Sequence, residues 1–174
     1  MSETLRPLDV SEWPESLAYV SEDMNGRPLR IHGLLANNPD LLAAWWAFRM
    51  HVVHGGELSD RHRELIVLRV AAHTGCWYEW ASHVERGLEA GLAIEEIEDV
   101  KRPLAESDWS EPDALVLRAV EDCLASGRIH ADTLAALQDR FNAAQVLDLI
   151  AIHGAYMMLA TIINSLGLEL DTSE

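Results

Sequence analysis

Four side chains that could carry out chemistry recur at helical spacing between residues 76 and 83. Cys76, Glu79, Trp80 and His83 stand at positions i, i+3, i+4 and i+7. A helix has about 3.6 residues per turn, so this spacing places all four on one face. That face offers a thiol that could act as a nucleophile, and a carboxylate and an imidazole that could move protons. The sequence therefore predicts a reactive site here.

Glu64 lies in the first half of the helix expected before this segment, where it could face the same side chains. Buried ionisable groups destabilise a fold unless they have hydrogen-bonding or ionic partners. A helix face that mixes such groups therefore indicates either such partners or a catalytic role. We predict that Glu64, Cys76, Glu79 and His83 surround one buried pocket as catalytic residues. One of the two glutamates would orient His83, which titrates near neutral pH and could take or return a proton at carbon. Gly87, one turn further on, would let another helix approach closely.

Three of these residues also have a purely structural interpretation. Cys76 could be a small buried apolar residue, and His83 could be a hydrogen-bonded histidine of the core or of an interface. Glu64 could form an ion pair with a neighbouring arginine such as Arg61 or Arg69. Such roles would leave the helical scaffold intact but would remove the argument for catalysis.

Glu79 has two other interpretations. It could be a solvated helix residue, or it could share a metal ion with His83, with Glu64 as a third ligand. His51 and His54 form a second potential metal pair, but nothing nearby completes a coordination shell. We predict neither a metal site nor a cofactor. The other histidines are expected at the surface or in packing roles: His32, His62, His73, His130 and His153.

Aromatic residues lie beside the predicted site. Tyr78 and Trp80 are candidates for substrate contacts because they flank the carboxylate at position 79. Tryptophans and tyrosines in such runs, including Trp77 and the tryptophan pair at 45–46, more often form core or oligomer contacts. Both interpretations of these aromatic residues therefore stay open at this point.

Helical periodicity covers almost all of the chain, and no segment shows the alternation or β-branched density of a half-buried strand. We therefore expect an all-α, single-domain fold over residues 1–174, with a core motif at about 38–100 and with residues 1–25 loosely packed. Capping and stop signals place the helices. They are expected from Asn38 to about His51, from Ser59 to Gly75, from Cys76 to about Ala90, around IEEIEDV, from Ser110 to Gly127, over ADTLAALQDRF, and from Asn142 to Gly167.

The charge of the chain limits its partners. There are 29 acidic and 13 basic residues, for a formal net charge of −16. The resulting field repels phosphate backbones and anionic lipid headgroups, so we expect neither nucleic acid nor a membrane surface as a partner. A small anionic substrate stays compatible with this charge, because arginines and histidines inside a closed site can outweigh the distant field.

Two cysteines, Cys76 and Cys123, are too few for a disulfide framework, and the N-terminal residues lack the apolar core of a secretory signal. We expect a cytoplasmic protein. The long apolar stretch 146–168 approaches the length of a membrane-spanning helix. It contains Asp148 and His153, which are costly in hydrocarbon, so we expect a buried core or subunit-interface helix instead.

The segment RHRELIVLRVAAHTGCWYEWASHVERGLEAGL resembles the core motif of the carboxymuconolactone decarboxylase and alkylhydroperoxidase-D-like (AhpD-like) superfamily. The hydroperoxidases of that superfamily have a glutamate, two cysteines three residues apart and a histidine four residues further on. Glu64, Cys76 and His83 match three of these positions, and Glu79 stands where the second cysteine would be. The resemblance implies an AhpD-like helical bundle that assembles as a dimer, trimer or hexamer, with the long C-terminal helix as a contact.

The absent second thiol separates two functions that the resemblance implies. A peroxidase would attack peroxide with that thiol, so a lone Cys76 would need an external thiol, or Cys123 as a distant partner. The decarboxylase branch does not depend on a cysteine pair, and has residues similar to Tyr78 and Glu79 at these positions. We therefore predict cofactor-free decarboxylation or isomerisation of a small lactone or keto acid. The alternatives are a Cys76-dependent alkylhydroperoxidase, and a non-catalytic binding or assembly protein on the same fold.

Overall fold

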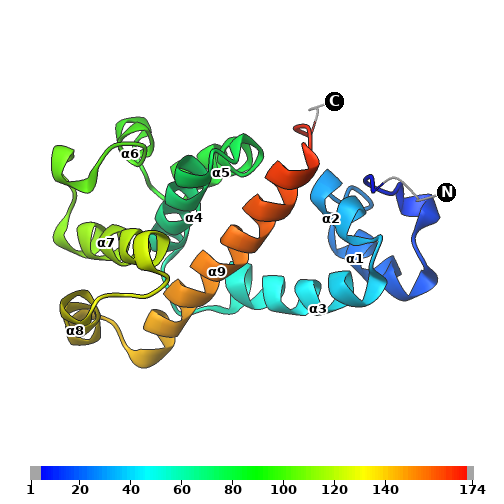
Figure 1. Ribbon diagram of the computed structural model, residues 1–174. Helices are drawn as coiled ribbons and strands as arrows, with labels where there is room; N and C mark the ends of the chain where they lie inside the picture. The colour runs from blue at the N-terminus through cyan, green and yellow to red at the C-terminus, as the bar shows by residue number, and fades with distance from the viewer. Residues whose placement is uncertain (1–4, 172–174) are drawn as a thin grey trace. The chain divides into compact units, whose positions relative to one another are not determined.

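The computed structural model describes residues 5–171 and contains no strand within that range, so the all-α prediction is confirmed (Figure 1). The helical elements include three short 3₁₀ helices (η1, η2, η4) and one π-helix (η3). In chain order they are η1 (Val10–Glu12), η2 (Glu15–Leu17), α1 (Ala18–Asp23), α2 (Arg30–Leu35), α3 (Pro39–Met50), η3 (His51–Gly55), α4 (Asp60–Thr74), α5 (Trp77–Glu89), α6 (Ile94–Asp99), η4 (Leu104–Glu106), α7 (Glu111–Ser126), α8 (Ala131–Arg140) and α9 (Ala143–Leu166).

The helices begin and end where the capping signals place them. Asn38 and Ser59 accept backbone hydrogen bonds at the starts of α3 and α4, as N-cap side chains do. Gly75 ends α4 in the left-handed region with φ 64°, a conformation that glycine adopts without strain. Cys76, predicted as the first residue of the next helix, is instead the N-cap of α5.

The chain divides into two compact units. One comprises Met1–Gly55 and Ser165–Glu174, and the other comprises Gly56–Asn164. The predicted reactive residues all belong to the second unit. The single domain predicted over residues 1–174 stays a prediction.

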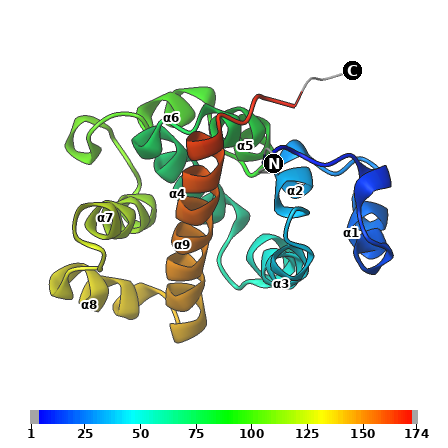
Figure 2. The ribbon, with the colours of Figure 1, turned by 45° about the vertical axis from the view of Figure 1, so that its right-hand side comes forward.

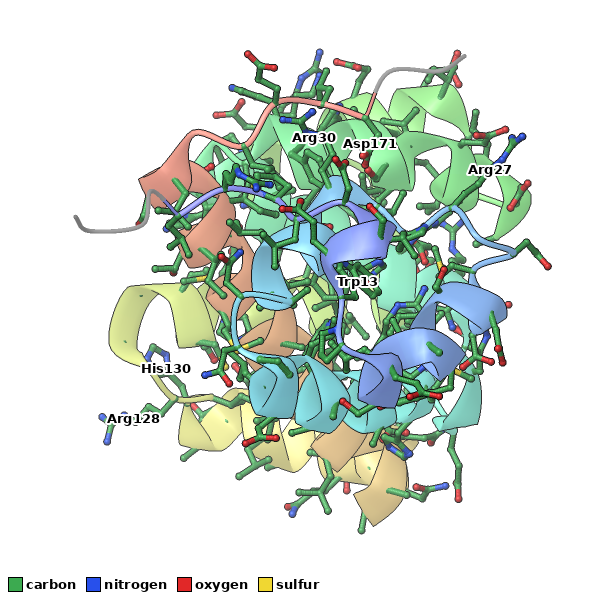
Figure 3. The ribbon with its side chains drawn as sticks, turned by 90° about the vertical axis from the view of Figure 1, so that its right-hand side faces the viewer. Trp13, Arg27, Arg30, Arg128, His130 and Asp171 are labelled. Atoms are coloured by element: carbon green, nitrogen blue, oxygen red, sulfur yellow. The ribbon has the colours of Figure 1, made fainter. Side chains whose placement is uncertain are left out.

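In the first unit, Leu17 and Val20 are buried, so this part of residues 1–25 is more tightly packed than the sequence predicts. Residues 1–4 of that range lie outside the described part of the chain. Buried His32 packs edge-on against Trp46, with ring centroids 5.3 Å apart. Near the other end of the chain, Asp171 accepts a hydrogen bond from the backbone N–H of Arg30. Figure 3 labels both residues.

In the second unit, α4 packs against α5 and α7, and α9 passes alongside α4 and α5 (Figures 1 and 2). One apolar cluster joins α4 and α7 to α6 and the loop before it. Gly87 of α5 faces this cluster, and a Cβ there would lie 3.2–3.3 Å from the side chains of Leu68, Leu92 and Ile97. The close approach predicted at Gly87 is therefore confirmed. The buried members of the cluster are Leu65, Leu68, Leu92, Ile97, Val100 and Leu117.

α9 is long and apolar enough, by length and composition, to cross a membrane, but half of its most apolar window is buried inside the protein. A core helix meets the same criteria, and α9 has this character. Asp148 lies near its start and is buried, and the Asp148 carboxylate accepts a hydrogen bond from the backbone N–H of Glu57 at 2.7 Å.

Candidate active site

Glu64 of α4 and His83 of α5 form the centre of the site. The Nδ1 atom of His83 lies 2.6 Å from Oε2 of Glu64, and both residues are 2% exposed. The short turn at Gly75 and Cys76 joins the two helices and lets them pack side by side. The predicted meeting of an imidazole and a carboxylate in a sheltered position is therefore present in the structure.

Glu79 lies on the other side of the imidazole. Its Oε2 atom is 3.5 Å from Nε2 of His83, one helical turn along α5. The side chain is buried, so the interpretation of Glu79 as a solvated residue is wrong. His83 therefore has a carboxylate near each ring nitrogen.

The arginine beside Glu64 is not one of those expected. Arg63 donates to Oε1 of Glu64 at 3.2 Å, and it also pairs with Asp60. Arg61 instead binds Glu96 and Asp113, and Arg69 binds Glu121 and two backbone carbonyl groups. The predicted pairing of Glu64 with either of these two is wrong, because successive residues of a helix point about 100° apart and these two face α6 and α7.

The pKa values of both Glu64 and His83 are shifted from their ordinary values. Burial acts to lower the pKa of His83, but hydrogen bonds with Glu64 and Glu79 outweigh it and raise that pKa. Burial acts to raise the pKa of Glu64, and the His83 hydrogen bond together with nearby Arg63 lowers it on balance. Both shifts favour a carboxylate beside an imidazolium, which is the form that can deliver a proton from Nε2.

Cys76 is fully buried at the start of α5. Burial raises the pKa of its thiol, and the charge of Glu79 adds to this rise. The backbone N–H groups of Glu79 and Tyr78 act in the opposite direction, but burial and the charge of Glu79 outweigh them. Cys76 is therefore mainly a thiol near neutral pH, as a small buried residue would be.

Two residues that contact His83 were not predicted from the sequence. Tyr156 of α9 stacks edge-on against His83, with ring centroids 5.1 Å apart and the planes at 89°. Arg86 places Nη1 3.3 Å from Nε2 of His83. The spacing i, i+3 from His83 could have identified Arg86. Tyr156 lies far away in sequence, so only the tertiary structure could reveal it.

The two predicted substrate-contacting aromatics lie elsewhere on α5. Trp80 packs against the apolar cluster and edge-on against Trp77, and the ammonium group of Lys101 lies 4.5 Å from its ring centroid. These contacts favour the core interpretation of Trp80. Tyr78 is buried, and its role in substrate binding stays a prediction.

Potential metal ligands do not converge in the described part of the chain. Residues 5–171 contain no group of three or more histidine, cysteine, aspartate or glutamate side chains placed to hold an ion. His51 and His54 are exposed on the π-helix η3. The triad of Glu64, Glu79 and His83 is arranged for hydrogen bonding instead.

Each of the two units contains a cavity lined by other residues. One, of about 500 Å³, lies beside Trp109 and Arg118 in the second unit. The other, of about 730 Å³, lies beside Trp13 and Asn37 in the first unit. None of the predicted catalytic residues lines either cavity.

The model of the carboxymuconolactone decarboxylase family matches residues 39–122, a range that includes Glu64, Cys76, Glu79 and His83. Residues 39–122, just under half of the chain, therefore resemble the carboxymuconolactone decarboxylase and AhpD-like superfamily. The match ends within α7, so Tyr156 on α9 lies outside it. None of the curated proteins matches the chain in sequence.

Solved structures of AhpD-like proteins have the same fold. An uncharacterized peroxidase-related protein from Silicibacter sp. TM1040 superposes with a TM-score of 0.77 at 18% identity, over 98% of this chain and 95% of its own. An AhpD-core protein from Ralstonia eutropha JMP134 gives 0.76 at 20% identity, over 98% and 94%. A cysteine-to-alanine variant of the debrominase Bmp8, in complex with 2,3,4-tribromopyrrole, gives 0.80 at 15% identity, over 98% and 93%. At these identities the likeness shows the fold alone.

Proposed function

We propose that the chain is an enzyme of this superfamily that uses His83 for cofactor-free acid-base chemistry on a small lactone or keto acid. The observation that carries the proposal is the 2.6 Å contact between Nδ1 of His83 and Glu64. It fixes the ring and engages Nδ1, so we assign proton transfer to Nε2. A positioned general acid or base contributes about a hundredfold to ten-thousandfold in rate.

The proposed steps follow from that arrangement. In a decarboxylation, the C–C bond to the departing carboxylate breaks, CO₂ leaves, and the electron pair moves into the conjugated carbonyl group as an enolate. Nε2 of the His83 imidazolium then donates its proton to carbon. In an isomerisation, Nε2 first removes a proton from one carbon and then returns it to another. Glu64 holds the imidazolium in place in both reactions.

Isotope exchange tests the proposal without a known substrate. A panel of lactones and keto acids is incubated with the protein in D₂O, and loss of carbon-bound protons is followed by NMR, together with CO₂ release. We expect exchange or CO₂ release with some members of the panel, and we expect His83→Gln to abolish it. His73→Gln, at an exposed position on α4, is the matched control. Undiminished exchange in the His83 variant would reject the proposed role.

A Cys76-dependent reaction with an external thiol is the second candidate, as an alkylhydroperoxidase. The backbone N–H groups of Tyr78 and Glu79 favour it, because they act to lower the pKa of the thiol. The raised pKa of the thiol weighs against it. Treatment with an alkyl hydroperoxide and a thiol donor separates the candidates: peroxide loss that disappears in Cys76→Ser would favour the peroxidase.

A binding or assembly role on the same scaffold is a third candidate. The two described cavities, neither of which is lined by His83, are the observation that favours it. Exchange and peroxide loss would both be absent in that case. Catalysis detected in either assay, and lost in the corresponding variant, would exclude a purely structural role.

We also propose that copies of the chain assemble through α9, in a cytoplasmic setting. Leu147 is 65% exposed and Ile150 is 43% exposed on this helix, which is apolar on all sides. A second copy that covered them would remove this apolar surface from water. Light scattering of the wild type should show a dimer, trimer or hexamer, and Leu147→Glu should lower the assembly state.

A further inference from the structure

The guanidinium group of Arg86 is close to the reactive nitrogen of His83. The distance from Nη1 to Nε2 is 3.3 Å. Arginine can only donate hydrogen bonds, so this contact needs a free lone pair on Nε2 and therefore a neutral imidazole. Nδ1 then carries the proton and donates a hydrogen bond to Glu64. Arg86 thus occupies the position from which Nε2 would meet a substrate.

The guanidinium group of Arg86 also has no counter-charge in the described part of the chain. Among residues 5–171, no carboxylate lies within ion-pairing distance of its guanidinium group, whereas Arg61, Arg63 and Arg69 all have acidic partners. One N–H group of Arg86 faces Nε2 of His83. Within residues 5–171, its other N–H groups are available to donate hydrogen bonds to a ligand. An arginine fork with free donors is suited to bind a planar carboxylate with two hydrogen bonds.

Two groups compete for Nε2. Glu79 at 3.5 Å favours a proton on that nitrogen, and Arg86 at 3.3 Å favours its absence. The charged and titratable groups that face His83 are Glu64 from α4, Glu79 and Arg86 from α5, and the Tyr156 ring from α9. The protonation of His83 therefore depends on where the Arg86 guanidinium lies.

We infer that Arg86 binds a carboxylate group of the substrate, and that this carboxylate draws the guanidinium group away from Nε2 of His83. The inference rests on the proposed acid-base function. A bound carboxylate neutralises the nearest cation, so the imidazolium becomes more favourable and Nε2 acquires the proton that it must deliver. Binding of the substrate carboxylate is then coupled to protonation of Nε2 of His83.

The neighbouring charges limit the ligand. Glu64 and Glu79 would repel a phosphate dianion more strongly than a carboxylate, which carries a single charge. An ion pair with Arg86 stabilises a carboxylate relative to neutral CO₂. The carboxylate held by Arg86 is therefore one that the reaction retains, and any departing carboxylate is a different group of the substrate.

Carboxylate binding can be measured without turnover. Protein with ¹⁵N-labelled histidine is titrated with sodium acetate or sodium benzoate at constant ionic strength, and the His83 ring nitrogens are followed by NMR. His83→Gln identifies the resonances, and sodium chloride is the reference salt. We expect the carboxylates to move the Nε2 signal towards that of the protonated ring and to raise the pH midpoint of His83, while chloride does neither.

Variants of Arg86 decide the inference. Loss of a hydrogen bond to a charged group weakens binding about tenfold or more, so Arg86→Gln should lose the carboxylate effect and Arg86→Lys should retain part of it. Arg128→Gln, at the exposed turn between α7 and α8 that Figure 3 shows, should behave as the wild type. Circular dichroism establishes that each variant is folded.

Two outcomes would overturn the inference: carboxylate binding that is equal in Arg86→Gln and wild type, or binding that leaves His83 unchanged. Either result leaves the proposed function to be tested by isotope exchange. Conversely, an Arg86-dependent shift without any exchange would reject the proposed function and retain the binding site. The two failures are therefore distinguishable.

Discussion

The Oε2 atom of Glu64 lies 2.6 Å from Nδ1 of His83, and this contact joins α4 to α5 inside the protein. Both side chains are buried, so neither can exchange its partner for water without a large desolvation penalty. A carboxylate that fixes the orientation of a histidine is a recurring arrangement for proton transfer. The following predictions test this relationship and the scaffold that supports it.

Replacement of Glu64 by Gln should lower turnover about a hundredfold or more, because the imidazole loses the partner that orients it. The Glu64 carboxylate raises the pKa of His83, so its removal should move the pH midpoint of His83 to lower values. Steady-state rates across pH, together with NMR titration, measure both effects. Glu85→Gln changes an exposed glutamate of α5, the helix that carries His83, and should alter neither. An unmoved midpoint in Glu64→Gln would contradict the pairing.

The same pair should make stability depend on pH. The pKa of His83 is raised on folding, so its contribution is present below the ordinary value of 6.5 and is lost as pH rises through the folded-state pKa. The pKa of Glu64 is lowered, so its contribution is present above the ordinary value of 4.5 and is lost as pH falls through the folded-state pKa. The pair should therefore stabilise most between about pH 4.5 and 6.5.

Urea unfolding of the wild type and of the double variant Glu64→Gln/His83→Gln across pH measures this dependence. The difference in unfolding free energy should be largest inside that window and should shrink on both sides. A difference that is constant from acid to alkaline pH would mean that the two side chains contribute only through packing.

The Cys76 thiol should react slowly near neutral pH. Burial raises its pKa above the ordinary value of 9.0, and alkylation requires the thiolate. The rate of iodoacetamide modification, measured by mass spectrometry in a Cys123→Ser background, should rise with pH and have its midpoint above 9.0. Turnover in the proposed acid-base reaction should change little in Cys76→Ser. A midpoint below the ordinary value would favour the peroxidase candidate.

A methyl group at Gly33 should strongly destabilise the first unit. A Cβ there would lie 2.6 Å from the backbone oxygen of Leu8, so the chain must shift. We expect a loss of about 2 kcal/mol or more in unfolding free energy, as is typical of overpacking. Gly154→Ala on α9 is the matched control, because its Cβ meets nothing within 4 Å and alanine favours a helix by up to about 1 kcal/mol. Equal stability of Gly33→Ala and wild type would contradict the packing at this position.

The sequence by itself determined the helices and the face of α5 that carries the reactive groups. Asn38, Ser59 and Gly75 act locally, through hydrogen bonds and backbone angles that involve only neighbouring residues, so their roles can be predicted from the chain alone. The positions of Glu79 and His83 on one face follow from helical periodicity.

Only the tertiary structure decided which groups meet. In the folded protein Glu64 contacts His83 and Arg63, whereas the sequence suggested Arg61 or Arg69 as its partner. Tyr156 of α9 packs against the imidazole of His83. Partner choice depends on how helices rotate and pack against one another, and side chains of similar charge compete for each partner. Local sequence fixes the identity of these groups, whereas the packing of α4, α5 and α9 fixes the distances on which their chemistry depends.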